Sequence, residues 1–420
     1  MRPSRLRSRH VRTRALVPIL ASGLVLAGAC SSTTSSNGTG TGTNAGTTAA
    51  PAGASTTGTA APASGYPMDD TLKLNQIQVL GSHNSYHLRT PKALRDEIDK
   101  VVPGVTISWD YAHPPLDEQF AKEGIRQIEL DVHLDPDARY ASRHALALAK
   151  LPVEGPAELK EPGLKVFHIQ ELDYESNCNT FIICLETVKK WSDANPGHVP
   201  IMILVEHKAD KIPDPFNMNF SQPVDWDKAS LDQVDQEIRK VFDDDQMITP
   251  DDVRGTHKTL EEAVLAGDWP TLGASRGKVL FALDNDDLSK LYAEGHPSLE
   301  GRIAFTNAEP GQPDAAFVKR NNPVEDGAEI DDLVKKGYVV RTLLDGDPKQ
   351  AVANDYAARD IALKGGAQWI STDYAVPDPA INPTYVVKLD GGTPGRCNPI
   401  NAPKTCTPAD IESPQHLTTK

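Results

Sequence analysis

The sequence lacks a basic patch in its main part and, after residue 29, any apolar stretch long enough to cross a membrane. Its formal net charge is −15 at pH 7, and Lys and Arg cluster only within the first 14 residues. Nucleic acids attract clustered positive charge, so this composition argues against a nucleic-acid partner. With 420 residues, the chain is long enough for one large catalytic domain with appendages.

Cysteine is also scarce. Apart from Cys30, the cysteines form two close pairs, Cys178/Cys184 and Cys397/Cys406. Neither pair has the CxxC spacing or the neighbouring histidines of a zinc finger, which argues against a zinc site. Exported proteins commonly oxidise such pairs. We therefore predict two local disulfides.

The N-terminus has the pattern of an export signal. Residues 1–29 contain six Arg but no acid and no Lys, and the apolar stretch 15–29 is too short to span a bilayer. Residues 26–30 resemble a bacterial lipobox, although Ala27 stands where a larger aliphatic residue is usual. We interpret residues 1–30 as a lipoprotein signal that leaves a lipid anchor on Cys30, on the outer face of the bacterial cell membrane. A plain signal peptide and secretion are the alternative.

A long segment of small and uncharged residues follows. Residues 31–65 are mainly Ser, Thr, Gly, Ala and Pro, a composition that cannot bury enough surface to offset the entropy of ordering. We predict a disordered linker there. The catalytic domain is expected over residues 66–375, followed by a loop-rich C-terminal extension over residues 376–420.

The main part of the chain alternates β-rich apolar runs with helical patterns. Some runs, such as IMILV and VLFAL, are almost continuously apolar, as in parallel strands buried on both faces. Eight strands are expected, over residues 77–81, 127–133, 165–169, 200–205, 278–283, 302–306, 338–344 and 368–372. Helices are expected over residues 180–195, 230–242, 259–266 and 349–364. This alternation predicts an α/β fold of the TIM-type (β/α)8 barrel class, with a doubly wound sheet as the alternative.

Polar residues gather where these strands end. The first predicted strand is followed by His83 and Asn84, the third ends at His168, and the fourth ends at Glu206. Three later strands end near acids, namely Asp284, Asp345 and Asp373. Each residue alone could be a turn or cap. Because barrel active sites lie at the carboxyl ends of the strands, we expect the group to form one site.

Three carboxylates within this group predict a metal site. Glu129 and Asp131 lie on one face of a strand and alternate with the apolar residues Ile128, Leu130 and Val132, and Glu206 adds a third negative charge. Such charges repel unless a cation compensates them. With the Asn84 amide, the donors are all oxygen, which suits Ca2+ and, less well, Mg2+. We predict one ion bound by these four residues.

Four segments carry a resemblance to a known family: GSHNSY at 81–86, GIRQIELDVHLDP at 124–136, KVFHIQ at 165–170 and PIMILVEHK at 200–208. In this order they resemble the catalytic region of the phosphoinositide-specific phospholipases C, most closely the small calcium-dependent bacterial and fungal members. The resemblance implies that His83 and His168 are catalytic and that the four oxygen-bearing residues bind calcium.

The resemblance also implies the reaction. Phosphatidylinositol at a membrane surface would be cleaved to diacylglycerol and inositol cyclic phosphate, with His168 protonating the leaving oxygen. The general base stays open between His83 and one of the carboxylates Glu129 and Glu206. Lys208 and Arg341 are candidate contacts for the substrate.

Alternative assignments differ at particular residues. Residues 139–163 form a longer insert than in the large eukaryotic enzymes, and His144 within it is a rival to His168. Glycerophosphodiester phosphodiesterases share the barrel but usually have His-Arg-Gly where this chain has His83, Asn84 and Ser85. Metal-independent phospholipases C replace the calcium with a basic side chain. A lipoprotein whose barrel only binds a lipid or sugar headgroup is the non-enzymatic alternative.

Overall fold

The computed structural model describes residues 65–346, 348–414 and 417. The predicted signal segment, Cys30 and almost all of the linker lie outside these residues, so these assignments stay predictions. Within the described ranges, none of the helices combines the length and the apolar character needed to cross a membrane.

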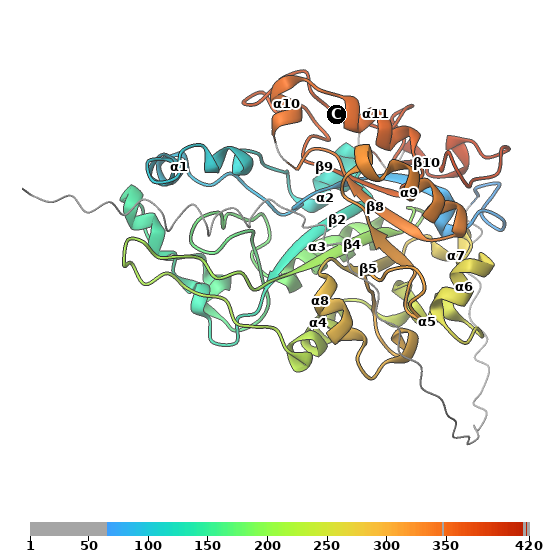
Figure 1. The fold of residues 1–420 in the computed structure, drawn as a ribbon, viewed down its shortest axis with the longest axis horizontal. Helices are drawn as coiled ribbons and strands as arrows, with labels where there is room; N and C mark the ends of the chain where they lie inside the picture. The colour runs from blue at the N-terminus through green and yellow to red at the C-terminus, as the bar shows by residue number, and fades with distance from the viewer. Residues whose placement is uncertain (1–64, 347, 415–416, 418–420) are drawn as a thin grey trace, which may run out of the picture.

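The described chain folds around parallel strands that form a nearly closed barrel (Figure 1). The strands are hydrogen bonded in the order β6-β5-β4-β2-β1-β9-β8-β7, and a parallel bridge between Asn307 and Phe317 joins the two ends of this row. Their bounds are β1 Ile77–Ser82, β2 Gln127–His133, β4 Ile201–Lys208, β5 Val279–Leu283, β6 Ala304–Phe305, β7 Phe317–Lys319, β8 Val339–Leu343 and β9 Trp369–Thr372. The predicted TIM-type barrel is therefore confirmed.

One predicted barrel strand was wrong, and another was missed. Residues 165–169 were expected to be a barrel strand, but only β3 (Lys165–Val166) forms there, and it pairs antiparallel with the end of β2. The chain then turns back on itself, with Ile169 bridged to Asp173 and Glu171 at a φ of 65°. The strand that completes the barrel is β7, whose three residues are too short for a pattern of alternation.

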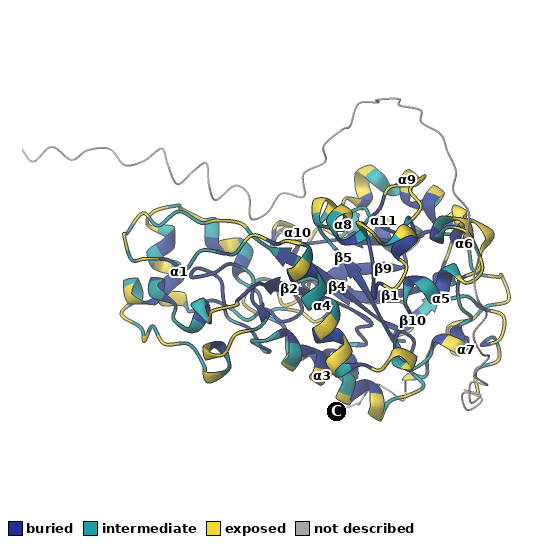
Figure 2. Cartoon of the chain, turned by 90° about the horizontal axis from the view of Figure 1, so that it is seen from below, coloured by how far each residue is buried: buried dark blue, intermediate teal, exposed yellow. Residues whose placement is uncertain are grey.

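Helices cover the outside of the barrel, with buried inner faces and exposed outer faces (Figure 2). Their bounds are α1 Lys92–Asp99, α2 Leu116–Glu118, α3 Phe181–Ala194, α4 Lys228–Val241, α5 Pro250–Arg254, α6 Leu260–Ala266, α7 Leu272–Ser275, α8 Asp286–Ala293, α9 Pro323–Lys336, α10 Lys349–Ala353 and α11 Ala357–Lys364. The single helix expected over residues 349–364 is wrong, because Asn354 adopts a left-handed φ of 53° and separates α10 from α11.

Both predicted disulfides are confirmed. Cys178 is bonded to Cys184 at the start of α3, and Cys397 is bonded to Cys406 in the C-terminal extension. The extension is also held by strand β10 (Gly395–Cys397), which pairs antiparallel with β1. Further along, the Glu412 carboxylate contacts Arg126, with both side chains fully buried. The extension is therefore packed onto the barrel.

The connections after β1 and β2 extend beyond the carboxyl ends of the strands (Figure 1). They form a second hydrophobic cluster, separate from the barrel core, that includes Leu94, Trp109, Tyr140, Phe167 and Tyr174. The insert over residues 139–163 belongs to this region as a series of short 3-10 turns. This cluster supports the loops that carry several residues of the site described below.

Candidate active site

The three predicted carboxylates meet at the carboxyl end of the barrel. β2 alternates, so that Ile128, Leu130 and Val132 belong to the hydrophobic core while Glu129 and Asp131 share the other face. In the neighbouring strand β4, Glu206 lies in register with Asp131. One oxygen from each of the three carboxylates lies within 4.8 Å of the other two. The set can therefore bind a single cation.

Asn84 has the conformation and the free atom expected of a further ligand. Its φ is 44°, a left-handed value that Asn adopts more readily than most residues. Its Nδ2 donates a hydrogen bond of 3.0 Å to the Tyr111 hydroxyl, whereas its buried Oδ1 has no hydrogen-bond partner among the described residues. The next residue, Ser85, hydrogen bonds to the Glu129 backbone and holds this segment against β2.

Two cationic side chains contact the carboxylates. A bound ion is therefore not the only positive charge beside them, contrary to what we expected from the sequence. Lys208 Nζ lies 2.9 Å from Glu206 Oε1 and 3.2 Å from Asp131 Oδ2. Arg341 Nη2, from β8, lies 2.5 Å from Glu129 Oε2. Lys208 reaches the cluster because it stands two residues after Glu206 on the same face of β4. Lys208 and Arg341 each offset part of the carboxylate charge, and the carboxylate oxygens remain hard donors of the kind that suits a divalent ion.

Burial and charge shift these groups in different directions. Burial raises the pKa of Asp131 well above its usual range, although the Lys208 charge opposes the shift. Burial also raises the pKa of Glu129, against the opposing charge of Arg341. For Glu206, burial is outweighed by the contact with Lys208, which lowers its pKa to about 2. A buried acid that resists ionisation is stabilised in its charged form when a cation binds beside it.

His83 belongs to a first histidine–aspartate pair. Its Nδ1 lies 3.0 Å from Asp373 Oδ1, and its Nε2 lies 4.0 Å from Glu129 Oε1. Burial alone would lower the pKa of His83, but the charges of Asp373 and Glu129 outweigh it and raise the pKa to about 10. His83 therefore holds a proton at neutral pH in this structure. The orienting role of Asp373 was missed, since the sequence marked it only as an acid at a strand end.

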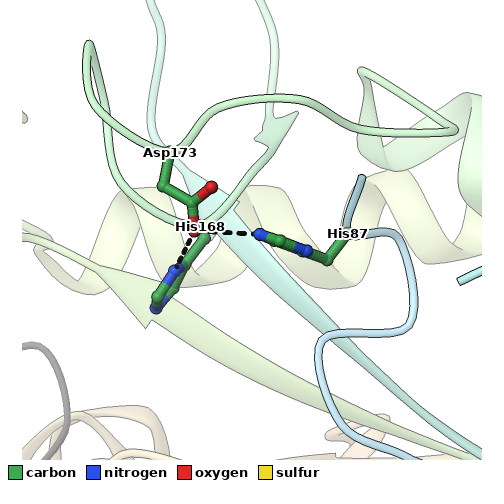
Figure 3. A group of neighbouring side chains, drawn as sticks. All are labelled: His87, His168 and Asp173. Atoms are coloured by element: carbon green, nitrogen blue, oxygen red, sulfur yellow. Dashed lines mark hydrogen bonds and ion pairs between the residues drawn. The ribbon is translucent and has the colours of Figure 1, made fainter. Parts of the chain in front are cut away.

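His168 belongs to a second histidine–aspartate pair, shown in Figure 3. Its Nδ1 lies 2.8 Å from Asp173 Oδ2, and the same oxygen lies 2.9 Å from Nε2 of His87. The pKa of His168 is lowered, first by burial and further by the Lys208 charge. His168 comes from the loop beyond β3 rather than from the end of a barrel strand, which corrects its predicted origin.

The pairing of His87 and His168 with Asp173 was not predicted from the sequence. Asp173 stands in a turn after a short strand, and His87 lies in the loop after β1, so no periodic pattern brings them together. The rival His144 lies elsewhere, with Nδ1 3.0 Å from Glu171 Oε1. Glu171 also accepts a hydrogen bond from the backbone of Ala145, which makes this contact part of the insert's own packing.

A match to a family model establishes the relationship that the four sequence segments suggested. The model for calcium-dependent phosphoinositide phospholipase C matches residues 72–399, well over half of the chain. The protein belongs to this family. The predicted resemblance is thereby confirmed, and with it the assignment as a phosphoric diester-cleaving enzyme of the phospholipase C type. None of the curated proteins compared with the chain matches it.

Solved structures resemble the chain more distantly. A calcium-dependent phosphoinositol-specific phospholipase C from a Pseudomonas species is 18% identical, with a TM-score of 0.47, over 79% of this chain and 97% of that one. A Ca2+-dependent phosphatidylinositol-specific enzyme from Streptomyces antibioticus is 20% identical, with a TM-score of 0.44, over 75% and 98%. A putative glycerophosphoryl diester phosphodiesterase from Silicibacter pomeroyi reaches 11% and 0.27, over 74% and 95%. At these sequence identities and TM-scores, the similarities do not support an inference about activity.

Proposed function

We propose that this phospholipase C cleaves the phosphodiester bond of phosphatidylinositol, releasing diacylglycerol and inositol cyclic phosphate in a calcium-dependent reaction. The observation that supports this most is the placement of two histidine–aspartate pairs at the same end of the barrel as the carboxylate cluster. A phosphodiester cleavage of this kind needs a proton acceptor, a proton donor and a positive charge near the phosphoryl oxygens.

The cation ligands of the proposal are Asn84, Glu129, Asp131 and Glu206. They supply hard oxygen donors, one of which, Asn84 Oδ1, is buried and without a hydrogen-bond partner among the described residues. When bound, calcium would neutralise charge on the phosphoryl group and lower the pKa of the attacking hydroxyl. We propose one ion, because the three carboxylates converge in a single group.

The proton that the leaving group needs is assigned to His168. As the ring 2-hydroxyl bonds to phosphorus, the bond to the diacylglycerol oxygen breaks, and that oxygen takes the proton of His168 Nε2. Asp173 anchors the opposite nitrogen of His168, which directs Nε2 away from the aspartate. His83, which is protonated in this structure, stabilises charge on the phosphoryl group, and the proton of the attacking hydroxyl passes to one of the carboxylates Glu129 and Glu206.

Two further proposals concern the substrate and the location of the protein. Lys208 and Arg341 contact the carboxylates in this structure, and their contact with substrate phosphate stays a prediction. We also propose export with a lipid anchor on Cys30, which would hold the enzyme near a membrane substrate. Mass spectrometry of the N-terminal peptide tests the anchor, since a diacylglyceryl group on Cys30 has a defined added mass.

A substrate panel tests the function. Purified protein is given phosphatidylinositol, glycerophosphoinositol and phosphatidylcholine in separate reactions with calcium, and products are followed by phosphorus NMR. The proposal expects turnover of phosphatidylinositol, with a cyclic phosphate as the first product. Preferred turnover of glycerophosphoinositol would instead support a glycerophosphodiester phosphodiesterase, and no turnover of any diester would support a binding protein.

A further inference from the structure

The group formed by His87, Asp173 and His168 contains more than the pair that the mechanism uses (Figure 3). His87 is fully buried, and so is Asp173, whereas the side chain of His168 is 11% exposed. A buried imidazole behind an active-site aspartate is costly unless each of its nitrogens has a hydrogen-bond partner. The partners of His87 therefore indicate what it does.

Both ring nitrogens of His87 face hydrogen-bond acceptors. Nδ1 lies 3.1 Å from the backbone carbonyl oxygen of Tyr111, which can only accept. Nε2 lies 2.9 Å from Asp173 Oδ2, and the charge of His87 is the main influence that holds the pKa of Asp173 below its usual range, against the effect of burial. An ionised carboxylate also can only accept. Both nitrogens of His87 therefore donate, which makes His87 an imidazolium paired with the Asp173 carboxylate.

A metal ion shared by the three residues fits the distances less well. Two ligands of a tetrahedral zinc ion, each about 2.0–2.1 Å from the metal, are about 3.3 Å apart. The Asp173 oxygen lies 2.8 Å from His168 and 2.9 Å from His87, which are hydrogen-bond distances. The three residues are therefore joined by hydrogen bonds, from His87 through Asp173 to His168, and we call this hydrogen-bonded chain the relay.

The relay leaves Asp173 little freedom. Oδ2 accepts from both histidines, and Oδ1 accepts from the Thr90 hydroxyl at 2.5 Å. The ring of His87 is fixed in turn by stacking on Tyr111, with centroids 4.3 Å apart. Asp173 accepts a hydrogen bond from Nδ1 of His168 and so orients the His168 ring. When Asp173 is held in place, Nε2 of His168 is the nitrogen that faces the substrate.

We propose that His87 is a positioning residue for the leaving-group step: through Asp173, it holds His168 with Nε2 presented to the departing oxygen. This inference rests on the proposed function of His168. His87 itself keeps both its protons, and the only proton transferred is the one that passes from His168 Nε2 to the diacylglycerol oxygen as the P–O bond breaks. Burial is the main cause of the lowered pKa of His168, and the charge of His87 acts in the same direction.

The test compares two substrates that differ in their need for a proton. Diacylglycerol leaves as an alkoxide and requires protonation, whereas a nitrophenyl ester of inositol phosphate releases a stabilised phenolate that leaves without it. Loss of a general acid typically costs about 100- to 10,000-fold, so His168→Ala should fall by this order on phosphatidylinositol and by far less on the nitrophenyl ester. A residue that acts through His168 should reproduce this difference between the substrates.

Three variants address His87 directly. His87→Leu removes both donors, His87→Gln retains one amide donor, and Thr90→Val removes only the hydroxyl that holds Asp173. His87→Leu should lose about 10-fold or more on phosphatidylinositol but little on the nitrophenyl ester, with partial recovery in His87→Gln. Thr90→Val, which is nearly isosteric, should lose about five-fold on phosphatidylinositol, the value of one hydrogen bond.

These measurements distinguish a failure of the proposed function from a failure of the positioning role of His87. If the unaltered enzyme does not cleave phosphatidylinositol, the proposed function fails. If it does, but His87→Leu and Thr90→Val lose activity equally on both substrates, or not at all, the positioning role is overturned while the function stands. Stoichiometric zinc in the purified protein that is lost in His87→Leu would overturn the relay in favour of a metal site.

Discussion

Replacement of Tyr111 by Phe isolates the hydrogen bond that orients Asn84. In the structure Asn84 Nδ2 donates to the Tyr111 hydroxyl at 3.0 Å, and this contact directs the opposite atom, Oδ1, away from Tyr111. Asn84 is 2% exposed and Tyr111 is 4% exposed, so water cannot easily replace the lost acceptor. The phenyl ring would keep its stacking contact with His87.

The magnitude follows from the burial of the amide. A buried donor that loses its partner costs about 1–3 kcal/mol, which corresponds to about a 5- to 150-fold change in an equilibrium constant. Loss of an outer-shell partner of a metal ligand typically costs 10- to 100-fold in affinity, which lies within that range. We therefore expect the calcium dissociation constant of Tyr111→Phe to rise by about 10- to 100-fold.

Isothermal titration of calcium into the full chain at fixed pH and ionic strength measures this change. Tyr140→Phe is the matched control, because the hydroxyl of Tyr140 is buried in the second hydrophobic cluster and has no hydrogen-bond partner among the described residues. It should bind calcium as the unaltered protein does. Equal dissociation constants for Tyr111→Phe and the unaltered protein would refute the assignment of Asn84 as an oriented ligand.

Three further predictions concern buried charge. Glu412→Gln removes the anion that pairs with fully buried Arg126 and should lower the free energy of unfolding by about 3–5 kcal/mol in urea denaturation; a loss below about 1 kcal/mol would mean that the C-terminal extension is not part of the folding unit. Burial raises the pKa of Asp345 to about 7, so the folded protein binds this proton more tightly than the unfolded chain does. The resulting contribution to stability, up to about 4 kcal/mol, is fully present below about pH 4 and is lost as the pH rises through 7. Asp345→Asn should be free of that loss, and an identical pH dependence of unfolding in both proteins would contradict the assignment. Because the pKa of His168 is lowered below its ordinary 6.5, mainly by burial, turnover at saturating calcium should fall as the pH rises through a value below 6.5. His168→Ala should lack that limb, whereas a rate that rises with pH in the same window would make His168 a base.

The convergence of the three carboxylates was the part of the site that the sequence predicted best. Glu129 and Asp131 stand two residues apart in a strand where they alternate with apolar residues, and Glu206 follows an apolar run, so strand periodicity and barrel geometry suffice to bring them together. The compensating cations were harder to predict. Arg341 reaches Glu129 from a distant strand, and nothing in the local sequence shows that an arginine side chain crosses the barrel.

The predictions that were wrong concern segments with an irregular backbone conformation. Residues 165–169 have the composition of a strand, but the turn that follows at Glu171 directs His168 back towards the site from a loop. Strand β7 is three residues long and is defined by its neighbours in the sheet rather than by its own pattern. Asp173 and His87 meet only because these two loops pack together. Such contacts arise from tertiary structure, which no periodicity in the chain encodes.

Turnover of phosphatidylinositol measured against free calcium is the most direct test of the metal-dependent mechanism. The ammonium of Lys208 already lies between two of the carboxylates, so the experiment decides whether this internal cation suffices. We predict that activity is lost in excess chelator and returns with added calcium, at a midpoint equal to the dissociation constant measured by titration. Full activity in excess chelator would contradict the account.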